Sequence, residues 1–149
     1  MRPPLDAISF LPQQPYLTPG TLRHLLVRAG REQDISDERI LATVRDSEPE
    51  FLVEQVGGLV ERDWPTILSL GERQQLAIAR LILARPSFAM LDRVSTALGS
   101  ARLTRSLQRL TDNSIAYMNF DEAVVSVDLY DAVLEIDANA TWNWTQRAC

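Results

Sequence analysis

With 149 residues, of which 46% are hydrophobic and 23% charged, the chain has the length and composition of one folded domain rather than of a disordered segment. Its net charge of −5 argues against nucleic acid as the main partner, and its single cysteine, Cys149, excludes a disulfide framework and a cysteine-based metal site. No apolar run reaches the ~18 residues of a membrane-spanning helix, and all 15 basic residues are arginine, which excludes any mechanism that needs a lysine.

The first predicted element is a short strand at residues 7–11, where an apolar run is closed by Pro12. Residues 13–20 contain two prolines and a glycine and are predicted to form a loop. From residue 21 to about residue 56 the apolar side chains follow a helical spacing, as in Leu22, Leu25 and Leu26. Polar breaks divide this stretch into about three short helices, so we expect a small helical unit here.

The clearest predicted helix covers residues 69–84. Ser69 and Glu72 have the spacing of a capping box, in which the hydroxyl accepts a helix-start N–H and the carboxylate reaches back. One face then carries Leu76, Ala79 and Leu83. Pro86 prevents the helix from continuing.

The remaining segment alternates between strand and helix patterns. Strands are predicted at 88–91, 114–118 and 132–136, and helices at 101–110 and 121–130. Asp121 and Glu122 fall in the first turn of the last helix, where acidic side chains suit the helix dipole. This alternation predicts an α/β domain with a largely parallel sheet.

Several conspicuous residues are expected to be structural. His24 lies in a helical stretch without nearby partners in sequence and is expected on the surface or in packing. Trp142 and Trp144 are expected to pack against the domain rather than to form a binding platform. The acidic residues between Glu32 and Glu50 alternate with arginines, a pattern typical of a solvated face.

Five short motifs follow one another in a fixed order: FLPQ at 10–13, LSLGERQQ at 68–75, LAIAR at 76–80, FAMLD at 88–92 and STAL at 95–98. This series resembles the nucleotide-binding domain of ABC transporters, with its Q-loop, signature sequence, signature helix, Walker B motif and the beginning of the D-loop. The flanking residues 56–64, together with Leu70, look most like the branch of peroxisomal fatty-acyl transporters and bacterial peptide-antibiotic and cobalamin exporters. The resemblance runs from about Arg2 to Trp144.

The resemblance implies an incomplete P-loop NTPase (RecA-like) parallel sheet flanked by helices, with a small α-helical subdomain. Residues 1–20 would form the Q-loop strand and loop, 21–68 the helical subdomain, and 69–149 the signature helix, Walker B motif and C-terminal core. Because Met1 falls shortly before the Q-loop, we expect the truncated C-terminal portion of such a domain, without Walker A. The missing P-loop strand and helix would leave apolar surface of the sheet uncovered.

The resemblance also implies a nucleotide site. The start of the signature helix would face the γ-phosphate of ATP held by an opposing subunit, because free N–H groups and the helix dipole favour an anion there. Ser69 would supply a hydroxyl, Gly71 would allow close backbone approach, and Leu70 replaces a glycine without removing N–H groups. Gln13 and Asp92 would hold Mg²⁺. The expected nucleotide-binding residues are Gln13, Ser69, Leu70, Gly71, Glu72 and Asp92.

Four departures from the family pattern bear on hydrolysis. There is no Walker A lysine, Arg93 replaces the catalytic glutamate, Asn119 replaces the switch histidine, and Gly99 replaces the D-loop aspartate. A guanidinium is always protonated and cannot deprotonate water. Asparagine cannot become charged near neutral pH as histidine can. No intact catalytic residue is therefore expected.

The implied cofactors are ATP and Mg²⁺, and the implied partners are another ABC nucleotide-binding domain and a transmembrane permease domain. The expected location is the cytoplasm, including the cytoplasmic face of the membrane. Our first hypothesis is a catalytically impaired binding module that offers Ser69 and Gly71 to the ATP of a complete partner. The alternatives are one half of a split ATPase and a non-functional remnant of a decayed transporter gene.

Overall fold

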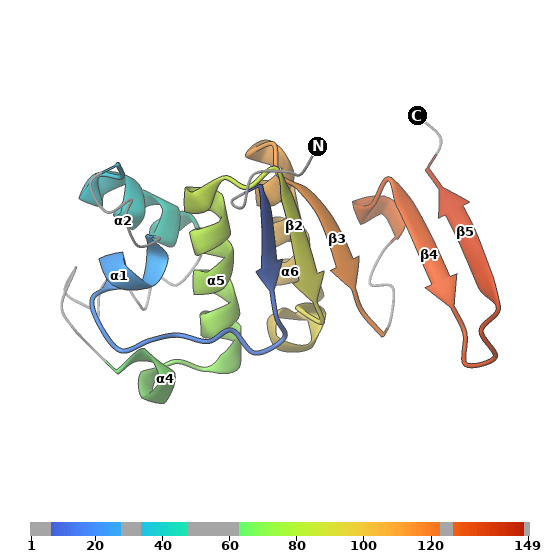
Figure 1. The fold of residues 1–149 in the computed structure, drawn as a ribbon, viewed down its shortest axis with the longest axis horizontal. Helices are drawn as coiled ribbons and strands as arrows, with labels where there is room; N and C mark the ends of the chain where they lie inside the picture. Colours follow the sequence, from blue (N-terminus) through green and yellow to red (C-terminus); the bar gives the residue numbers. More distant parts are fainter. Residues whose placement is uncertain (1–6, 28–33, 48–62, 123–126, 148–149) are drawn as a thin grey trace.

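The computed structural model describes residues 7–27, 34–47, 63–122 and 127–147 (Figure 1). In chain order the elements are β1 (Ile8–Leu11), α1 (Leu22–Leu26), α2 (Asp37–Asp46), α4 (Trp64–Ile67), α5 (Leu70–Ala84), β2 (Phe88–Asp92), α6 (Ser95–Asp112), β3 (Ala116–Phe120), the 3-10 turn η1 (Val127–Leu129), β4 (Ala132–Ile136) and β5 (Trp142–Gln146). The predicted α/β class is confirmed, and the three-stranded parallel sheet flanked by helices is consistent with part of a P-loop NTPase fold.

The parallel sheet has the order β1-β2-β3, with β2 in the centre. The pairing aligns Leu11 with Leu91 and Leu91 with Asn119, so the three strands end at nearly the same level. Ala89 and Leu91 of the central strand are buried. This register brings the residues that follow each strand to one end of the sheet.

Helix α5 lies between two hydrophobic clusters and contributes to both. The face carrying Leu76, Ala79 and Leu83 packs with α1, α2 and Trp64 in the first cluster. The remaining apolar side chains of α5 pack with the sheet and with α6 in the second cluster; they are Ala77, Ile78, Leu81 and Ile82. Two faces of α5 are therefore buried, while Arg80 and Ala84 remain exposed.

The helical part of the molecule is fixed to α6 by Arg109. Its guanidinium donates to the Ser47 hydroxyl (2.6 Å) and to the Thr43 carbonyl (3.1 Å), at the C-terminal end of α2. Helix carbonyls lack internal partners at that end, where the dipole also favours a cation. Arg109 therefore serves as a C-terminal cap for α2 as well as a link between α2 and α6.

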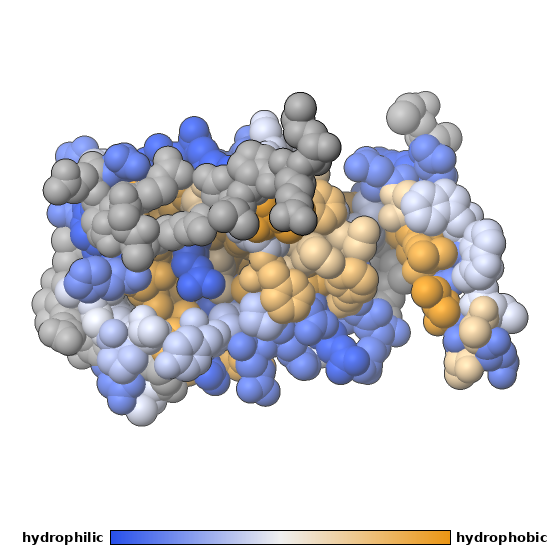
Figure 2. All heavy atoms as spheres, viewed as in Figure 1, coloured by the Kyte–Doolittle hydropathy of each residue, from blue (hydrophilic) through white to orange (hydrophobic). Residues whose placement is uncertain are grey.

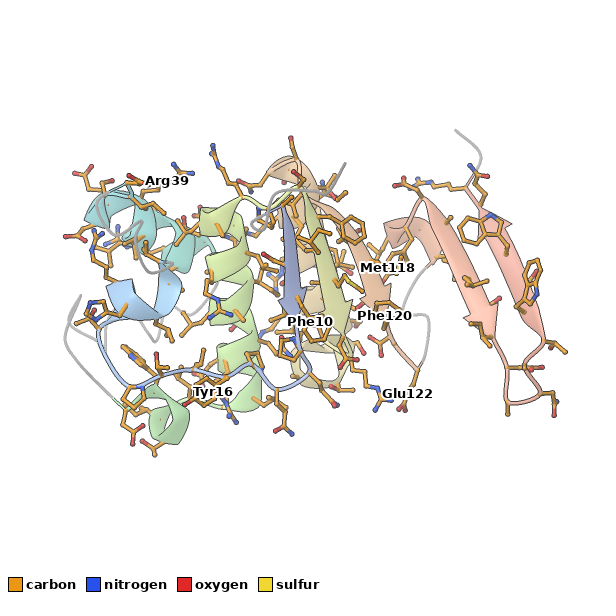
Figure 3. All side chains as sticks on the ribbon, viewed as in Figure 1. Phe10, Tyr16, Arg39, Met118, Phe120 and Glu122 are labelled. Carbon is orange, nitrogen blue, oxygen red and sulfur yellow. The ribbon has the colours of Figure 1, made fainter. Side chains whose placement is uncertain are left out.

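One face of the parallel sheet carries exposed apolar side chains. Helix α6 lies behind the sheet in Figure 1, and the opposite face is turned to the viewer. Figure 2 shows apolar residues over β1–β3 on that face, where Figure 3 places Phe10, Met118 and Phe120. These three side chains are about half exposed, as is Ile8, which shares the exposed side of β1 with Phe10. In the described part of the chain, the apolar surface that we expected to find uncovered is therefore present.

Three elements differ clearly from the sequence-based expectation. Helix α6 begins at Ser95 rather than at 101, and continues through Gly99, whose φ of 69° kinks it and suits a residue without a side chain. Strand β3 starts two residues later than predicted. The helix predicted at 121–130 is wrong: Asp121 and Glu122 are not helical, Val127–Leu129 form only a 3-10 turn, and 123–126 lie outside the described residues.

The C-terminal strands form an antiparallel hairpin that the sequence analysis did not predict as such. β4 was expected, but its partner β5 was not. Trp142 is 70% exposed and Trp144 55%, so the expectation that both pack against the domain is wrong. They lie opposite Ile136 and Leu134, and pack within the hairpin as cross-strand neighbours. Among helices in the described ranges, none has the length and apolar character needed to cross a membrane.

Asp137 organises the turn of this hairpin, which leads to a pH prediction. Its carboxylate accepts from the Asn139 N–H (2.8 Å), the Thr141 N–H (2.9 Å) and the Thr141 hydroxyl (2.6 Å). The Thr141 side chain, above all, lowers the pKa of Asp137 below its ordinary value of 3.8. At pH values above the ordinary pKa, the ionised, hydrogen-bonded carboxylate therefore stabilises the turn. This contribution is lost as the pH falls through the lowered pKa of the folded state.

A carboxyl NMR titration is expected to give Asp137 a midpoint below 3.8. Thr141→Ala removes the hydroxyl donor, so the midpoint of Asp137 should then move up toward its ordinary value. An unchanged midpoint in the variant would mean that the hydroxyl does not hold the carboxylate in solution.

Candidate functional site

The candidate residues gather at one end of the molecule. The strands β1, β2 and β3 all run toward the end where α5 begins (Figure 1). Gln13 follows β1, Asp92 ends β2, and Asn119 is the penultimate residue of β3. The side chain of Gln74 in α5 joins the two parts, since it donates to the carbonyls of Pro12 (3.1 Å) and Gln13 (2.5 Å). The structure thus brings the predicted strand-end residues and the start of α5 to the same side.

The start of α5 is a complete capping box. The Ser69 hydroxyl accepts from the Glu72 N–H (3.3 Å) and donates to the Glu72 carboxylate (2.6 Å), which also accepts the Ser69 N–H (2.7 Å). This confirms the local structure that the S-x-x-E spacing predicts. Ser69 is exposed, and residues 70–73, the first turn of this 15-residue helix, are partly exposed.

Gly71 lies where α5 and α6 come close together. A Cβ atom at this position would lie 3.0 Å from the carbonyl oxygen of Ala97, which is closer than nearly all real Cβ contacts. The absence of a side chain therefore lets the first turn of α5 sit against the first turn of α6. Leu70, which precedes it, is half-buried.

The loop after β1 is held from two directions. Gln74, fully buried in α5, holds its main chain at Pro12 and Gln13. The Gln13 side-chain amide donates to the Thr96 hydroxyl (3.4 Å), which in turn donates to the carbonyl of Arg93 (2.7 Å). Gln13 is therefore connected through Thr96 to the turn that follows β2.

Arg93 begins the turn after β2 in a left-handed conformation, with φ of 49°. Its N–H donates to the carbonyl of Phe120 (2.8 Å), which fixes the turn to the end of β3. Its guanidinium lies 3.3 Å from the Glu122 carboxylate, and both side chains are largely exposed. Figure 3 shows Glu122 at this end of the sheet. The positive charge of Arg93 is thus paired with a carboxylate that follows the neighbouring strand.

Glu122 was missed by sequence reasoning, which assigned it to the first turn of a helix. The Arg93–Glu122 ion pair joins residues that follow two different strands, so no local sequence spacing predicts it. The available signal was the register, because neighbouring parallel strands that end together place their following residues side by side.

The side chain of Asn119 is hydrogen-bonded on the helix-covered side of β3. Its amide nitrogen donates to the Tyr130 hydroxyl (2.9 Å), while its amide oxygen is buried and has no hydrogen-bond partner in the described part of the chain. Burial raises the pKa of Tyr130 above its ordinary value of 10.0, and the hydrogen bond from Asn119 offsets part of that rise. Tyr117 packs edge-on against Tyr130, with ring centres 6.2 Å apart.

The chemistry of the strand ends suits a hard cation with few protein ligands. In the described ranges no three His, Cys, Asp or Glu side chains cluster as a metal site. The Asp92 carboxylate and the Gln13 amide nevertheless follow adjacent strands at the same sheet end. Mg²⁺ keeps several waters and needs only one or two protein oxygens besides phosphate, so these residues fit it.

A surface pocket between α2, α5 and α6 is separate from these residues. Three arginines from one face of α6 line it together with five other side chains; the lining residues are Asp46, Ser47, Gln75, Arg102, Arg105, Ser106, Gln108 and Arg109. None of the predicted site residues contributes to it.

No protein-family model matches the chain. It is 32% identical over 142 residues, 95% of its length, to an uncharacterised ABC transporter ATP-binding protein of Synechocystis. It is 30% identical over 150 residues to the lysosomal cobalamin transporter ABCD4 of Mus musculus, covering 93% of the chain, and 29% identical over 140 residues to ABC transporter D family member 1 of Arabidopsis thaliana, covering 91%. The chain spans 22%, 24% and 10% of the length of these relatives, respectively.

Proposed function

Because the chain is homologous to the ATP-binding proteins of ABC transporters, we propose that it supplies the signature-helix side of an ATP site while a complete partner domain holds the nucleotide. The observation that carries this proposal is the start of α5, where exposed Ser69 caps a helix whose first turn is partly exposed. In this role the chain binds and senses ATP across an interface and does not hydrolyse it with its own residues.

The physical basis is the anion affinity of a helix N-terminus. The first N–H groups of α5 have few partners within the helix, and the dipole adds a partial positive charge. The Ser69 hydroxyl can donate to a phosphate oxygen once it turns away from the Glu72 carboxylate, and Gly71 lets the first turn of α5 pack closely against α6. Leu70 and Gly71 contribute first-turn N–H groups, while the Glu72 N–H and carboxylate hold Ser69 in place.

The proposal also assigns the strand ends. Asp92 and Gln13 would hold Mg²⁺, which would neutralise phosphate charge when bound. Gln13 is hydrogen-bonded to Thr96 through its side chain and to Gln74 of α5 through its carbonyl. A structural change at the start of α5 would therefore alter the position of Gln13. From its homology to ABC transporter proteins, we further propose that the chain has a permease domain as a second partner and lies at the cytoplasmic face of a membrane.

Hydrolysis is proposed to be impaired because two positions carry the wrong chemistry. The guanidinium of Arg93 cannot accept a proton from water, and it forms an ion pair with Glu122. Asn119 cannot become charged, and its amide is bound to Tyr130. The chain also contains no lysine that could grip phosphates.

The test is nucleotide-dependent association with a complete ABC ATP-binding domain, such as that of the Synechocystis relative, measured by sedimentation velocity. Association is expected with Mg-ATP and not without nucleotide. Ser69→Asp should weaken it at least about tenfold, because a carboxylate still caps the helix but repels phosphate. Ser69→Asn is the matched control, since it caps equally well without the charge.

Association that is equal with and without ATP, or equal for Ser69→Asp and Ser69→Asn, would contradict the proposal. No association in either state would favour the remnant hypothesis instead. Turnover on mixing with an N-terminal half would favour the split ATPase.

A further inference from the structure

The surface pocket between α2, α5 and α6 has a polar lining that the proposed function does not use, and its volume is about 230 Å³. In the described part of the chain, five polar residues are buried, and three of them, Ser47, Gln75 and Ser106, line this one pocket. Buried polar groups normally have hydrogen-bond partners, because burying them without one costs free energy. A concentration of such groups around one hollow therefore requires an explanation.

Two of these three side chains have donors to offer. The Ser47 hydroxyl is already used, since it donates to the Thr43 carbonyl (2.8 Å) and accepts from Arg109 (2.6 Å). The Ser106 hydroxyl and the Gln75 side-chain amide, in contrast, form no hydrogen bond with another residue of the described ranges. A hydroxyl carries one donor and an amide nitrogen carries two. The pocket wall can therefore donate to the oxygens of a ligand from both α5 and α6.

Three arginines of α6 add positive charge to the same pocket. Arg102, Arg105 and Arg109 all line it, at spacings of three and four residues. Residues at these spacings are neighbours on one helix face, where like charges repel each other and destabilise the helix. The chain as a whole has a net charge of −5, so this cluster is not part of a generally basic surface. A bound anion would relieve the repulsion.

Arg102 is the arginine most open to a ligand. Arg109 is half-buried and holds the C-terminal end of α2 through Ser47 and Thr43. Arg102 is exposed and forms no hydrogen bond or ion pair with another residue of the described ranges. A guanidinium presents N–H donors in a planar fork that can bind two oxygens of one oxyanion.

Size and charge restrict the class of ligand. One carboxylate, that of exposed Asp46, also lines the pocket, so the three arginines outnumber the acidic groups by two and favour a dianion. The volume lies below the ~300–1,000 Å³ typical of sites for drug-sized molecules. Donors on two helices suit an anion whose oxygens point in several directions, as those of a tetrahedral oxyanion do.

We propose that this pocket binds a small phosphate-type dianion. The Arg102 guanidinium binds two of its oxygens, and the Ser106 hydroxyl and the Gln75 amide donate to the others. Arg105 and Arg109 contribute positive charge. The bound anion links α5 to α6 and therefore stabilises the folded chain. The site is separate from the start of α5, and the inference does not depend on the proposed ATP-related function.

The test is an NMR titration of the full chain with inorganic phosphate, at constant ionic strength and without nucleotide. Saturable shifts are expected for the Arg102 side-chain N–H and the Gln75 side-chain amide, with half-saturation at about 1 mM or below. Arg102→Gln should weaken binding at least about tenfold, because it removes a charge-assisted, two-oxygen contact. Arg80→Gln is the matched control: it removes the same charge from an exposed position of α5 outside the pocket, and should bind within about twofold of wild type.

Asp46→Asn gives a change in the opposite direction. It removes the one carboxylate of the pocket lining and should tighten phosphate binding by about threefold, since the repulsion of the anion is lost. The substitution lies at the C-terminal end of α2, where a negative charge opposes the helix dipole, so the fold should tolerate it.

Equal phosphate affinities of the Arg102→Gln and Arg80→Gln variants, or weaker binding by Asp46→Asn, would overturn the inference. So would shifts that do not saturate, or that sodium chloride reproduces at the same ionic strength, because both indicate screening alone. The wild-type titration decides even if a variant fails to fold. Shifts confined to the start of α5 would overturn the inference and leave the proposed function intact, whereas a failure of the ATP-dependent association would leave this titration unaffected.

Discussion

Trp64→Ala is expected to lower the free energy of unfolding by about 3–5 kcal/mol, the range typical of a large aromatic side chain removed from a core. Trp64 is completely buried in the first hydrophobic cluster, among leucines of α1 and α5. Its indole N–H donates to the carbonyl of Gly20 (2.7 Å). The variant would leave a cavity and an unpaired buried carbonyl, and both effects destabilise the fold. Urea denaturation followed by far-UV circular dichroism measures the change.

Trp142→Ala provides the matched control, because Trp142 is 70% exposed on the hairpin. Its free energy of unfolding is expected within about 0.5 kcal/mol of wild type, as for most surface substitutions. A loss for Trp142→Ala as large as that expected for Trp64→Ala would mean that the hairpin face is covered in solution. A loss for Trp64→Ala as small as that expected for Trp142→Ala would mean that the helical cluster contributes less than its burial indicates.

The second large effect is expected for Gln74→Ala, with a loss of about 2–4 kcal/mol. The Gln74 side chain is fully buried and donates to two successive carbonyls, those of Pro12 and Gln13. Truncation leaves both carbonyls without their donor and opens a cavity in α5. The same change should speed hydrogen exchange at Gln13, because the loop after β1 loses its main attachment.

Gln75→Ala is the control for this variant, since Gln75 is the next residue of the same helix but lines the surface pocket instead. Its effect is expected to be clearly smaller, and exchange at Gln13 should not change. If Gln75→Ala sped exchange at Gln13 as much as Gln74→Ala did, the attachment of the loop would have to be ascribed to α5 as a whole.

The parts of the fold that could be predicted from sequence are those that a few neighbouring residues determine. The Ser69 and Glu72 capping box depends on a spacing of three residues, and the structure has it as predicted. The apolar runs of β1 and β2 are each bounded by proline or a polar residue, so their positions were also found. The start of α5 and the strand ends follow directly from these elements.

The features that were missed depend on residues far apart in the chain. The pair of Arg93 and Glu122 forms only because β2 and β3 end together. Helical periodicity was assigned to 121–130 from composition and acidic residues, whereas Tyr117 and Asn119 bind the carbonyl of Leu129 and the hydroxyl of Tyr130 in a non-helical segment. The exposure of Trp142 and Trp144 depends on which other parts of the protein pack against the hairpin. The sequence of the hairpin alone does not determine this.

The position of α5 has a consequence for how the chain loses its structure. One side of this helix completes the cluster formed with α1, α2 and Trp64, and the other completes the cluster formed with the sheet and α6. Neither cluster can open without removing partners from the same helix. The helical part and the sheet should therefore melt together in a single all-or-none transition, with coincident midpoints for circular dichroism and tryptophan fluorescence, rather than as two independently folding units.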